Sequence, residues 1–286
     1  MADIDLRKVL PLQLTWLAGL ALAWGMWDLL GTERFGQDAH AYWAAWQGEW
    51  RTDMYDIAPG HLDAFNYSPV FALATWPLAQ LPFWAFVTLW TTACVAALVW
   101  LLLPLGMRWV PPLLLLSAPE ILTGNVFWLM ALVCVVGTLP RRPGTRQWHG
   151  GWWSVIALTK LTPALGPIWF LVRREWRPLT ASVVVSAVLI VGSALLVPDL
   201  WRQWFEFLID NEASGSTVGS TVLPPLLYRL PVAVLLTAYA AWSDRVWLLP
   251  VAVVLACPVA GLAVFVVLAA IPRLLQRRRA LTPASG

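Results

Sequence analysis

The sequence predicts an all-α polytopic membrane protein, and three observations lead to this fold class. Apolar residues (Ala, Val, Ile, Leu, Met, Phe, Trp, Tyr and Cys) make up 59% of the 286 residues. Charged residues make up only 12%, whereas a soluble domain carries about 25% and uses them to cover its surface. The 21 Trp residues suit a membrane–water interface, where the indole ring is buried and its N–H is hydrated. These observations exclude soluble enzymes, secreted disulfide scaffolds, disordered chains and nucleic-acid-binding proteins.

Seven apolar stretches divide the chain, and a single membrane span needs about 20 residues. No long linker, repeat or low-complexity region separates the stretches, so we predict one membrane domain over residues 1–286. The first stretch is too long for the core of a signal peptide, and no cleavage motif follows it, so we expect it to remain as a span. The stretches cover residues 10–30, 69–104, 111–139, 150–172, 179–198, 223–242 and 246–272.

The placement of basic residues predicts how these stretches cross the membrane. Seven simple spans from a cytoplasmic N-terminus would leave two arginine clusters outside, against the positive-inside rule. Three stretches carry a central proline (Pro119, Pro163 and Pro258), which can break a helix into two short ones. With these three as broken pairs, the chain has about ten segments, and fourteen Lys and Arg lie inside against three outside. Both termini are then cytoplasmic, including the basic tail 273–286, and we expect the protein in the cell (inner) membrane.

The two predicted outer loops, residues 31–68 and 199–222, hold ten of the sixteen acidic residues. In the first loop, apolar residues at 39, 42, 43, 46 and 50 recur at helical spacing, which predicts an interfacial helix over 38–50. Asp38 would lie at its N-cap or in its first turn, where the helix dipole favours a carboxylate. Because broken helices are tolerated in a membrane only beside protein or a water-filled cavity, we expect the loops and the helix breaks to enclose a cavity opening outward.

Several short motifs occur in an order that resembles a known family. They are Asp38-x-His40-x-Tyr42, Met54-Tyr55, Phe65-x-Tyr67-x-Pro69, Gly124-Asn-Val126, Ala157-Leu-Thr-Lys160-Leu-Thr-Pro163 and Leu196-x-Pro198-Asp199-x-Trp201. Over residues 10 to about 245, the chain resembles glycosyltransferase family 87, the polyprenol-phosphate-mannose-dependent mannosyltransferases of the GT-C fold. The resemblance implies a GT-C-like bundle and places the family's catalytic Asp at Asp38. The chain is shorter than usual for the family. Family members carry a polar, often His-containing motif in their C-terminal helices. The corresponding stretch of this chain is Leu255-Ala-Cys-Pro258-Val-Ala-Gly261, which has no His or acidic residue.

Asp38 and Lys160 are the leading candidates for chemistry. Sugar transfer needs a base that takes the proton of the acceptor hydroxyl, and a carboxylate such as Asp38 can serve; alternatively, Asp38 only caps its helix. Lys160 lies in an apolar stretch just before a predicted break, where an unpaired charge costs at least about 2.5–3.5 kcal/mol. Its partner would be the phosphate of the donor, on which charge grows as the sugar leaves, or else the carboxylate of Glu120.

The remaining candidates each have a plain structural alternative. His40 could orient Asp38 or contact phosphate, or have no special role. Three tyrosines could line a sugar cavity or simply anchor the chain at the interface. Two polar residues at the first break could face the same cavity, or could instead cap a helix or take part in helix packing. One arginine after the second outer loop could be a second phosphate ligand or could snorkel to the interface. These last six are Tyr42, Tyr55, Tyr67, Glu120, Asn125 and Arg229.

Together these features predict an integral membrane glycosyltransferase, a hexosyltransferase that moves mannose or a related hexose from a polyprenyl-phosphate donor to an acceptor at the extracytoplasmic face. The expected partners are membrane lipid, the polyprenyl-phosphate-linked sugar and a glycan or glycolipid acceptor, with no nucleic acid. The sequence has no Gly-rich phosphate loop or zinc-ligand spacing, so we expect no metal and no cofactor apart from the donor. The alternative is a non-catalytic protein of the same fold that binds, transports or assembles lipid-linked sugars; the short chain and the missing C-terminal motif favour it.

Overall fold

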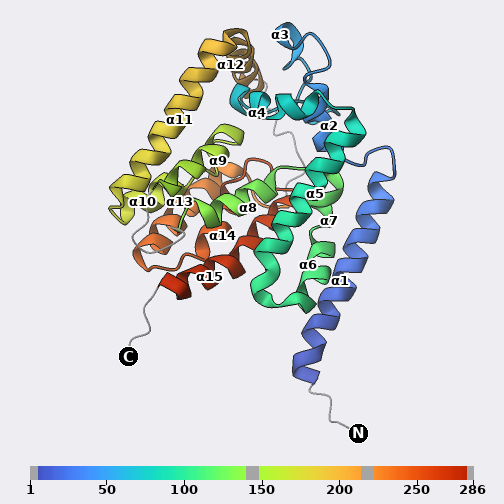
Figure 1. Ribbon diagram of the computed structural model, residues 1–286, viewed down its shortest axis with the longest axis vertical. Coiled ribbons are helices and arrows are strands. Elements are labelled where there is room, and N and C mark those ends of the chain that lie inside the picture. The colour runs from blue at the N-terminus through green and yellow to red at the C-terminus, as the bar shows by residue number, and fades with distance from the viewer. Residues whose placement is uncertain (1–5, 140–147, 214–221, 282–286) are drawn as a thin grey trace.

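The structure, a computed structural model, describes residues 6–139, 148–213 and 222–281, and every regular element in these ranges is a helix (Figure 1). This confirms the all-helical fold class. The α-helices are α1 Leu6–Leu30, α2 Gln37–Ala44, α3 Trp50–Asp53, α4 Pro69–Ala79, α5 Phe83–Leu102, α6 Val110–Leu116, α7 Ala118–Thr123, α8 Phe127–Val136, α9 Trp153–Thr159, α10 Gly166–Val172, α11 Trp176–Leu196, α12 Pro198–Ala213, α13 Leu226–Trp242, α14 Leu248–Ala256 and α15 Ala270–Leu281. The 3₁₀ helices are η1 Leu103–Leu105, η2 Met107–Trp109, η3 His149–Trp152 and η4 Leu262–Ala269.

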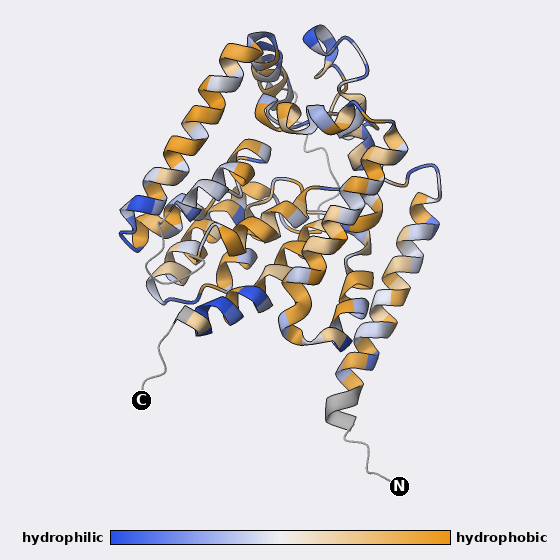
Figure 2. Cartoon of the chain, viewed as in Figure 1, coloured by the Kyte–Doolittle hydropathy of each residue, from blue (hydrophilic) through white to orange (hydrophobic). Residues whose placement is uncertain are grey.

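The outer helices consist largely of hydrophobic residues (Figure 2), and many of these residues are exposed. Within the described residues, two helical segments are long and apolar enough to cross a bilayer: Phe83–Leu105, which is α5 with η1, and α11. On α11, Val188 is 64% exposed and Leu195 is 80% exposed. Water would not tolerate such a surface over a whole helix, but lipid would, so these faces indicate a helical membrane protein.

Each of the three stretches expected to break does contain a turn between short helices. The turns are Gly124–Val126 between α7 and α8, residues 160–165 between α9 and α10, and residues 257–261 between α14 and η4. Pro163 and Pro258 lie in these turns, as expected. Pro119 instead lies in the first turn of α7, where its missing N–H is not needed, and the first pair turns at Gly124 in the left-handed conformation (φ 71°).

Two expected helices have different extents. The stretch 69–104 divides at residues 80–82 into α4 and α5, and Figure 1 shows α4 lying across the top of the bundle. The helix expected over 38–50 ends at Ala44, because the chain turns before α3. Its apolar face packs into the protein against α4 and α5, and Ala39 and Tyr42 are almost completely buried. This helix therefore serves protein packing as well as lying in the first loop.

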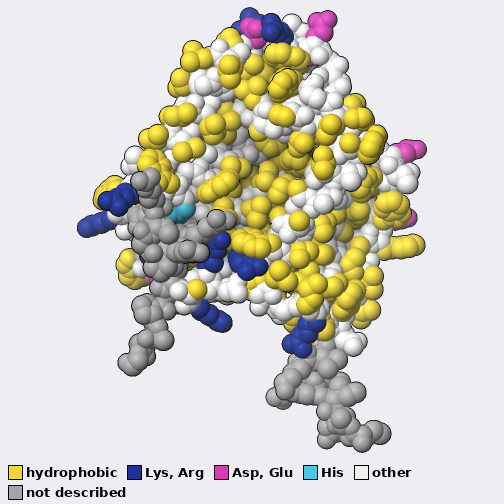
Figure 3. Space-filling view, viewed as in Figure 1, with side chains coloured by type: hydrophobic (Ala, Val, Ile, Leu, Met, Phe, Trp, Pro, Cys, Tyr) yellow, Lys and Arg dark blue, Asp and Glu magenta, His cyan; other side chains and the backbone are white. Residues whose placement is uncertain are grey.

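Charged groups mark the two ends of the molecule. On the visible face, Asp and Glu lie mainly toward the end with α2, α3 and α12, whereas Lys and Arg lie mainly toward the opposite end (Figure 3). The basic helix α15 crosses that opposite end. Arg273 donates to the carbonyl of Trp100 and lies over its ring, 4.5 Å from the centroid, and Arg278 bonds Asp244 at 2.6 Å. These bonds tie α15 to α5 and to the loop after α13.

Candidate functional site

The centre of the site is the carboxylate of Asp38, which another element holds in place. Asp38 lies in the first turn of α2, as expected, and is half-buried. Nδ2 of Asn125, in the turn between α7 and α8, donates to Oδ2 of Asp38 at 2.7 Å. The amide of Asn125 is itself oriented, because its Oδ1 accepts the N–H of Val126 at 2.7 Å. Asp38 thus has a fixed partner across the site, which a helix cap would not need.

Gly124 permits this contact by letting α2 approach the turn. A Cβ at residue 124 would lie 2.6 Å from the Cβ of Ala39, which is fully buried beside Asp38. Real Cβ atoms do not approach so closely, and the left-handed backbone at Gly124 also disfavours any other residue. Glycine at this position therefore sets the distance between Asp38 and Asn125.

We expect Gly124→Ala to lower both stability and any activity that depends on Asp38. Overpacking a close contact and straining a left-handed backbone together cost about 2–3 kcal/mol, because α2 must move away from the turn. Thermal unfolding in detergent measures the loss. Gly25→Ala is the matched control, since a Cβ there has nothing within 4 Å. Equal Tm values for the two variants would contradict this account of Gly124.

Burial changes the acid–base properties of Asp38. It raises the pKa of this carboxyl above its ordinary value, because the charged form loses hydration. Hydrogen bonds from Thr123 and Asn125 and the charge of Lys160 act in the opposite direction without cancelling the effect. A carboxylate with a raised pKa accepts a proton more readily, which suits a general base.

Lys160 supplies a positive charge to the same region. It follows α9 directly, in extended conformation, and is half-buried. Its Nζ lies 4.3 Å from the ring centroid of Phe127 and 5.5 Å from that of Tyr67. Among the described residues, no carboxylate lies within ion-pair distance of Nζ, so the pair with Glu120 is not formed. The ammonium is held by ring faces and keeps its hydrogen-bond donors for an anion.

Glu120 lies deep in the same region and joins the two sides of the first break. It is fully buried, and its Oε1 accepts the N–H of Trp128 at 2.8 Å. Its Oε2 has no hydrogen-bond partner within the described part of the chain. The charges of Asp38 and Lys160 both act on Glu120, so the three ionisable groups form one electrostatic unit.

Two tyrosines complete this group, which we call the Asp38–Lys160 cluster. The hydroxyls of Tyr42 and Tyr67 lie 3.1 Å apart, and the two rings meet edge to face. Both tyrosines are buried, and Asp38 acts electrostatically on each. The cluster therefore brings together six of the residues singled out in the sequence: Asp38, Tyr42, Tyr67, Glu120, Asn125 and Lys160.

Three of the predicted site residues make other contacts. His40 pairs through Nδ1 with Asp63 at 2.6 Å, and its ring packs against Phe83. The first of these contacts joins two parts of the first loop. Tyr55 donates to the carbonyl of Tyr67 at 2.8 Å and so supports the backbone behind the cluster. The guanidinium of Arg229 is buried, and its bonds fasten the third break. Its acceptors are the carbonyls of Pro224, Leu255, Cys257 and Pro258. Direct roles of these three residues in binding stay predictions.

The structure adds two residues that the sequence did not single out. Thr123, at the end of α7, helps to lower the pKa of Asp38 while its hydroxyl donates to the carbonyl of Pro119 at 2.8 Å, and Phe127 lies against the Lys160 ammonium. A hydroxyl directly before Gly124-Asn125 was a usable signal for Thr123. No sequence signal distinguishes Phe127 from the other apolar residues of its stretch, because its role depends on the return of the chain after the break.

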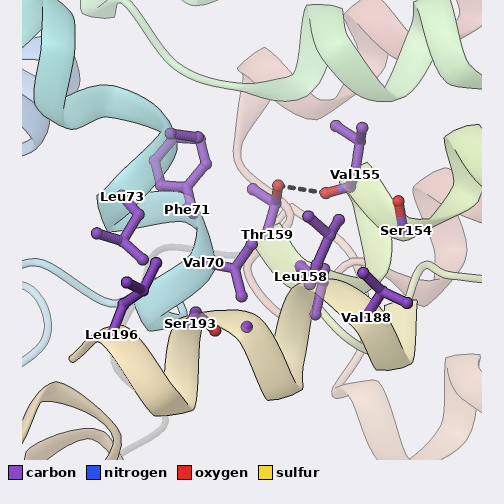
Figure 4. Close-up of a pocket in the computed structure, with 13 residues that line it drawn as sticks. Val70, Phe71, Leu73, Ser154, Val155, Leu158, Thr159, Val188, Ser193 and Leu196 are labelled. Carbon is purple, nitrogen blue, oxygen red and sulfur yellow. Dashed lines mark hydrogen bonds between the residues drawn. The ribbon is translucent and has the colours of Figure 1, made fainter. Parts of the chain in front are cut away.

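An apolar groove of about 430 Å³ lies between α4, α9 and α11, and its lining includes Phe71 and Thr159. Figure 4 shows Phe71 and Thr159 side by side at this groove, with Leu158 and Val188 farther along it. Phe71 also packs on Tyr67, with ring centroids 4.8 Å apart, and Thr159 directly precedes Lys160. The groove and the cluster thus share a wall.

Comparison with known proteins agrees with the resemblance seen in the motifs. A polyprenol-phosphate-mannose-dependent alpha-(1-2)-phosphatidylinositol pentamannoside mannosyltransferase of Mycolicibacterium smegmatis is 28% identical over 186 residues, which is 58% of this chain and 43% of that relative. The chain thus aligns with less than half of the relative's length, and no solved structure matches it. The profile of glycosyltransferase family 87 matches residues 65–285. The matched region begins after Asp38 and includes the third break. Because this match covers most of the sequence, the chain belongs to glycosyltransferase family 87.

Proposed function

We propose that the protein transfers mannose or a related hexose from a polyprenyl-phosphate donor to an acceptor at the extracytoplasmic face of the membrane. Membership of the family supports sugar transfer, and the name of the curated relative supports the donor. The observation that carries the proposal is the Asp38–Lys160 cluster. A carboxylate held by Asn125 and a lysine without a carboxylate partner lie together in a buried region, which suits a base and an anion ligand.

The proposed reaction is an inverting displacement at the anomeric carbon. Asp38 takes the proton from the acceptor hydroxyl as its oxygen attacks that carbon. The bond between the anomeric carbon and the phosphate oxygen breaks, and its electron pair remains on the phosphate. Lys160 stabilises the charge that grows there. Asn125 positions Asp38 and does not need to change its protonation state.

The groove between α4, α9 and α11 is the proposed site of the donor's polyprenyl chain. Its lining is mainly apolar, and it includes Thr159, the residue directly before Lys160. A donor in this position would place its hydrocarbon in the groove and its phosphate at the ammonium. The apolar chain and the anionic headgroup of one molecule would then each meet a matching environment.

Incubation of the purified protein with radiolabelled polyprenyl-phosphate mannose tests the function. Transfer of the label to a lipid or glycan acceptor, with release of polyprenyl phosphate, is the expected result. The third break favours a second candidate, a non-catalytic binder of the same donor. This break lacks the polar motif of the family, and Arg229 is committed to its carbonyls. The binder would hold the labelled donor without turnover.

The orientation in the membrane gives a separate prediction. The charge distribution supports about ten membrane segments, cytoplasmic termini and a cytoplasmic loop around Gly144, which lies outside the described residues. An impermeant maleimide should label Ala58→Cys, in the exposed first loop, on intact cells, but Gly144→Cys only after permeabilisation. The native cysteines Cys94, Cys134 and Cys257 are buried and give little background. Labelling of Gly144→Cys on intact cells would show that the first pair, which precedes this loop, is not broken as proposed.

A further inference from the structure

A second apolar groove lies between α1 and the helices α6 and α7, and its volume is about 710 Å³. All of its lining residues are apolar, among them Trp24 and Trp27 from α1 and Ile121 and Leu122 from α7. In Figure 1, α9 and α11 lie on the left of the molecule, whereas α1, α6 and α7 lie on the right. The two grooves therefore open on opposite sides of the Asp38–Lys160 cluster. A groove with this lining favours a hydrocarbon chain and disfavours a free sugar.

Two glycines of α1 show which of its faces packs on the bundle and which is open. At Gly19, α1 touches the bundle so closely that a Cβ would lie 2.8 Å from the carbonyl oxygen of Pro112. Nearer to the first outer loop, a Cβ at Gly25 would have nothing within 4 Å, and Trp24 is 75% exposed. These two glycines lie on different faces of α1, so one face packs tightly on the bundle while another is open, and the helix is buried again at its end, at Leu30. The groove lies between α1 and the helices α6 and α7.

One lining residue of this groove is close in the chain to the base side of the cluster. Leu122 lines the groove, and the next residue, Thr123, acts on the pKa of Asp38. The carbonyl of Leu122 also accepts the N–H of Gly36 at 2.8 Å, which anchors the start of α2. One short piece of backbone thus forms the groove wall and positions the carboxylate. A molecule held by its hydrocarbon chain in this groove would present its other end near Asp38, whereas the groove at α9 is lined by Thr159, next to Lys160 in the chain.

We infer that the acceptor is a membrane glycolipid whose hydrocarbon chain lies in the groove between α1, α6 and α7, with its sugar at Asp38. This inference rests on the proposed function, because that function assigns the base to the acceptor and Lys160 to the donor phosphate. The two lipid substrates then enter from opposite sides, and neither chain has to pass the other. A soluble glycan would make no use of an apolar groove that ends at the base.

Photo-crosslinking tests where each lipid chain lies without requiring turnover. The acceptor probe is octyl α-mannoside with a diazirine at the end of its chain, chosen because the acceptor named for the curated relative carries mannose. The donor probe is polyprenyl-phosphate mannose with a diazirine in its chain. Mass spectrometry should find mannoside adducts in α1 or α7 and donor adducts in α4, α9 or α11. The exchanged pattern, or mannoside adducts in neither α1 nor α7, would overturn the inference.

A matched pair of variants shows whether the groove itself is responsible. Ala23 lines the groove, so Ala23→Phe fills part of it, whereas Gly25→Phe adds the same ring to open space on the same helix. We expect Ala23→Phe to lower mannoside crosslinking about tenfold, because several methylene groups lose their apolar contacts, and Gly25→Phe to leave it unchanged. Equal crosslinking in the two variants would overturn the inference. Loss of mannoside crosslinking in both variants, with donor crosslinking unchanged, would also overturn it, because filling the groove would then not be the cause.

Transfer kinetics separate this inference from the proposed function. In wild type, KM for octyl α-mannoside should be about tenfold lower than KM for methyl α-mannoside; Ala23→Phe should remove that difference, and Gly25→Phe should keep it. Equal KM values for the two mannosides in wild type would overturn the inference while transfer itself confirms the function. The expected crosslinks without transfer to either mannoside would support the groove as a glycolipid site and count against the enzymatic function.

Discussion

Replacement of Asp38 by Asn should lower the turnover number by about 10²–10⁴-fold and leave donor binding unchanged. The amide keeps the size of the side chain and its place beside Asn125, but it cannot take a proton from the acceptor. Because the donor phosphate is assigned to Lys160, its affinity should not depend on this carboxylate. Single-turnover transfer from labelled donor, together with the donor Kd, measures both quantities.

Asp63→Asn is the matched control for this variant. Asp63 lies in the same loop, pairs with His40 and has a positive φ of 66°, which Asn tolerates. It should keep nearly full turnover. Thermal unfolding must accompany both assays, because loss of a carboxylate from a first helical turn costs about 1 kcal/mol. Full turnover by a folded Asp38→Asn protein would remove Asp38 from the mechanism and favour the binder.

The pH profile of the wild type gives an independent sign of the same role. A general base works only when it is ionised, so kcat/KM should fall as pH falls through the pKa of Asp38. Burial raises that pKa, so this fall in kcat/KM, the acid limb of the profile, should occur at a pH above the ordinary pKa of an aspartate, about 3.9. The limb should be absent from the residual activity of Asp38→Asn. If Asp38 had only a structural role, the acid limb would remain in the pH profile of Asp38→Asn.

Lys160→Met should weaken donor binding by about 10–100-fold and lower the turnover number as well. A charged hydrogen-bonding group contributes about 1.5–3 kcal/mol to binding an anion, and its effect grows as the phosphate gains charge in the transition state. Binding of labelled donor and single-turnover transfer measure the two effects. Lys160→Arg should retain part of both, because it keeps the charge but changes the geometry.

The stability of Lys160→Met separates ligand binding from a structural role. In the described structure, the ammonium rests on the rings of Phe127 and Tyr67 without a carboxylate partner. Its replacement by an apolar side chain of similar length should therefore leave Tm unchanged or raise it. A strong fall in Tm with unchanged donor affinity would show that Lys160 supports the fold and does not bind the phosphate.

The sequence predicts the residues of the cluster better than their surroundings. Asp38, Asn125 and Lys160 stand out because each is polar beside an apolar stretch, and each lies at a loop or a break. The sequence does not show which groups His40 and Tyr55 contact. The path of the first loop brings His40 to Asp63 and Tyr55 to the backbone of Tyr67.

The breaks and the grooves show the same limit. Proline predicts where a helix is interrupted, but it did not show that Gly124 would make the first turn, because that depends on the approach of Ala39. Arg229 resembled a surface arginine, yet its guanidinium satisfies carbonyls that the third break leaves free. The grooves arise from the spacing of whole helices and have no signature in any one segment.

The bond between Asp38 and Asn125 joins residues 87 positions apart, and the bond from Ser68 to Leu158 spans 90 positions. A ribosome must therefore add several membrane segments after α2 before the partners of its carboxylate exist. Until Gly124 and Asn125 arrive, the first loop can pack against α4 and α5, but the Asp38 carboxylate lacks its partner Asn125. Lys160 follows later still. Chains arrested before residue 160 should consequently fail to retain the polyprenyl-phosphate donor even when they have entered the membrane, so retention of the donor would report completed assembly of the nascent protein.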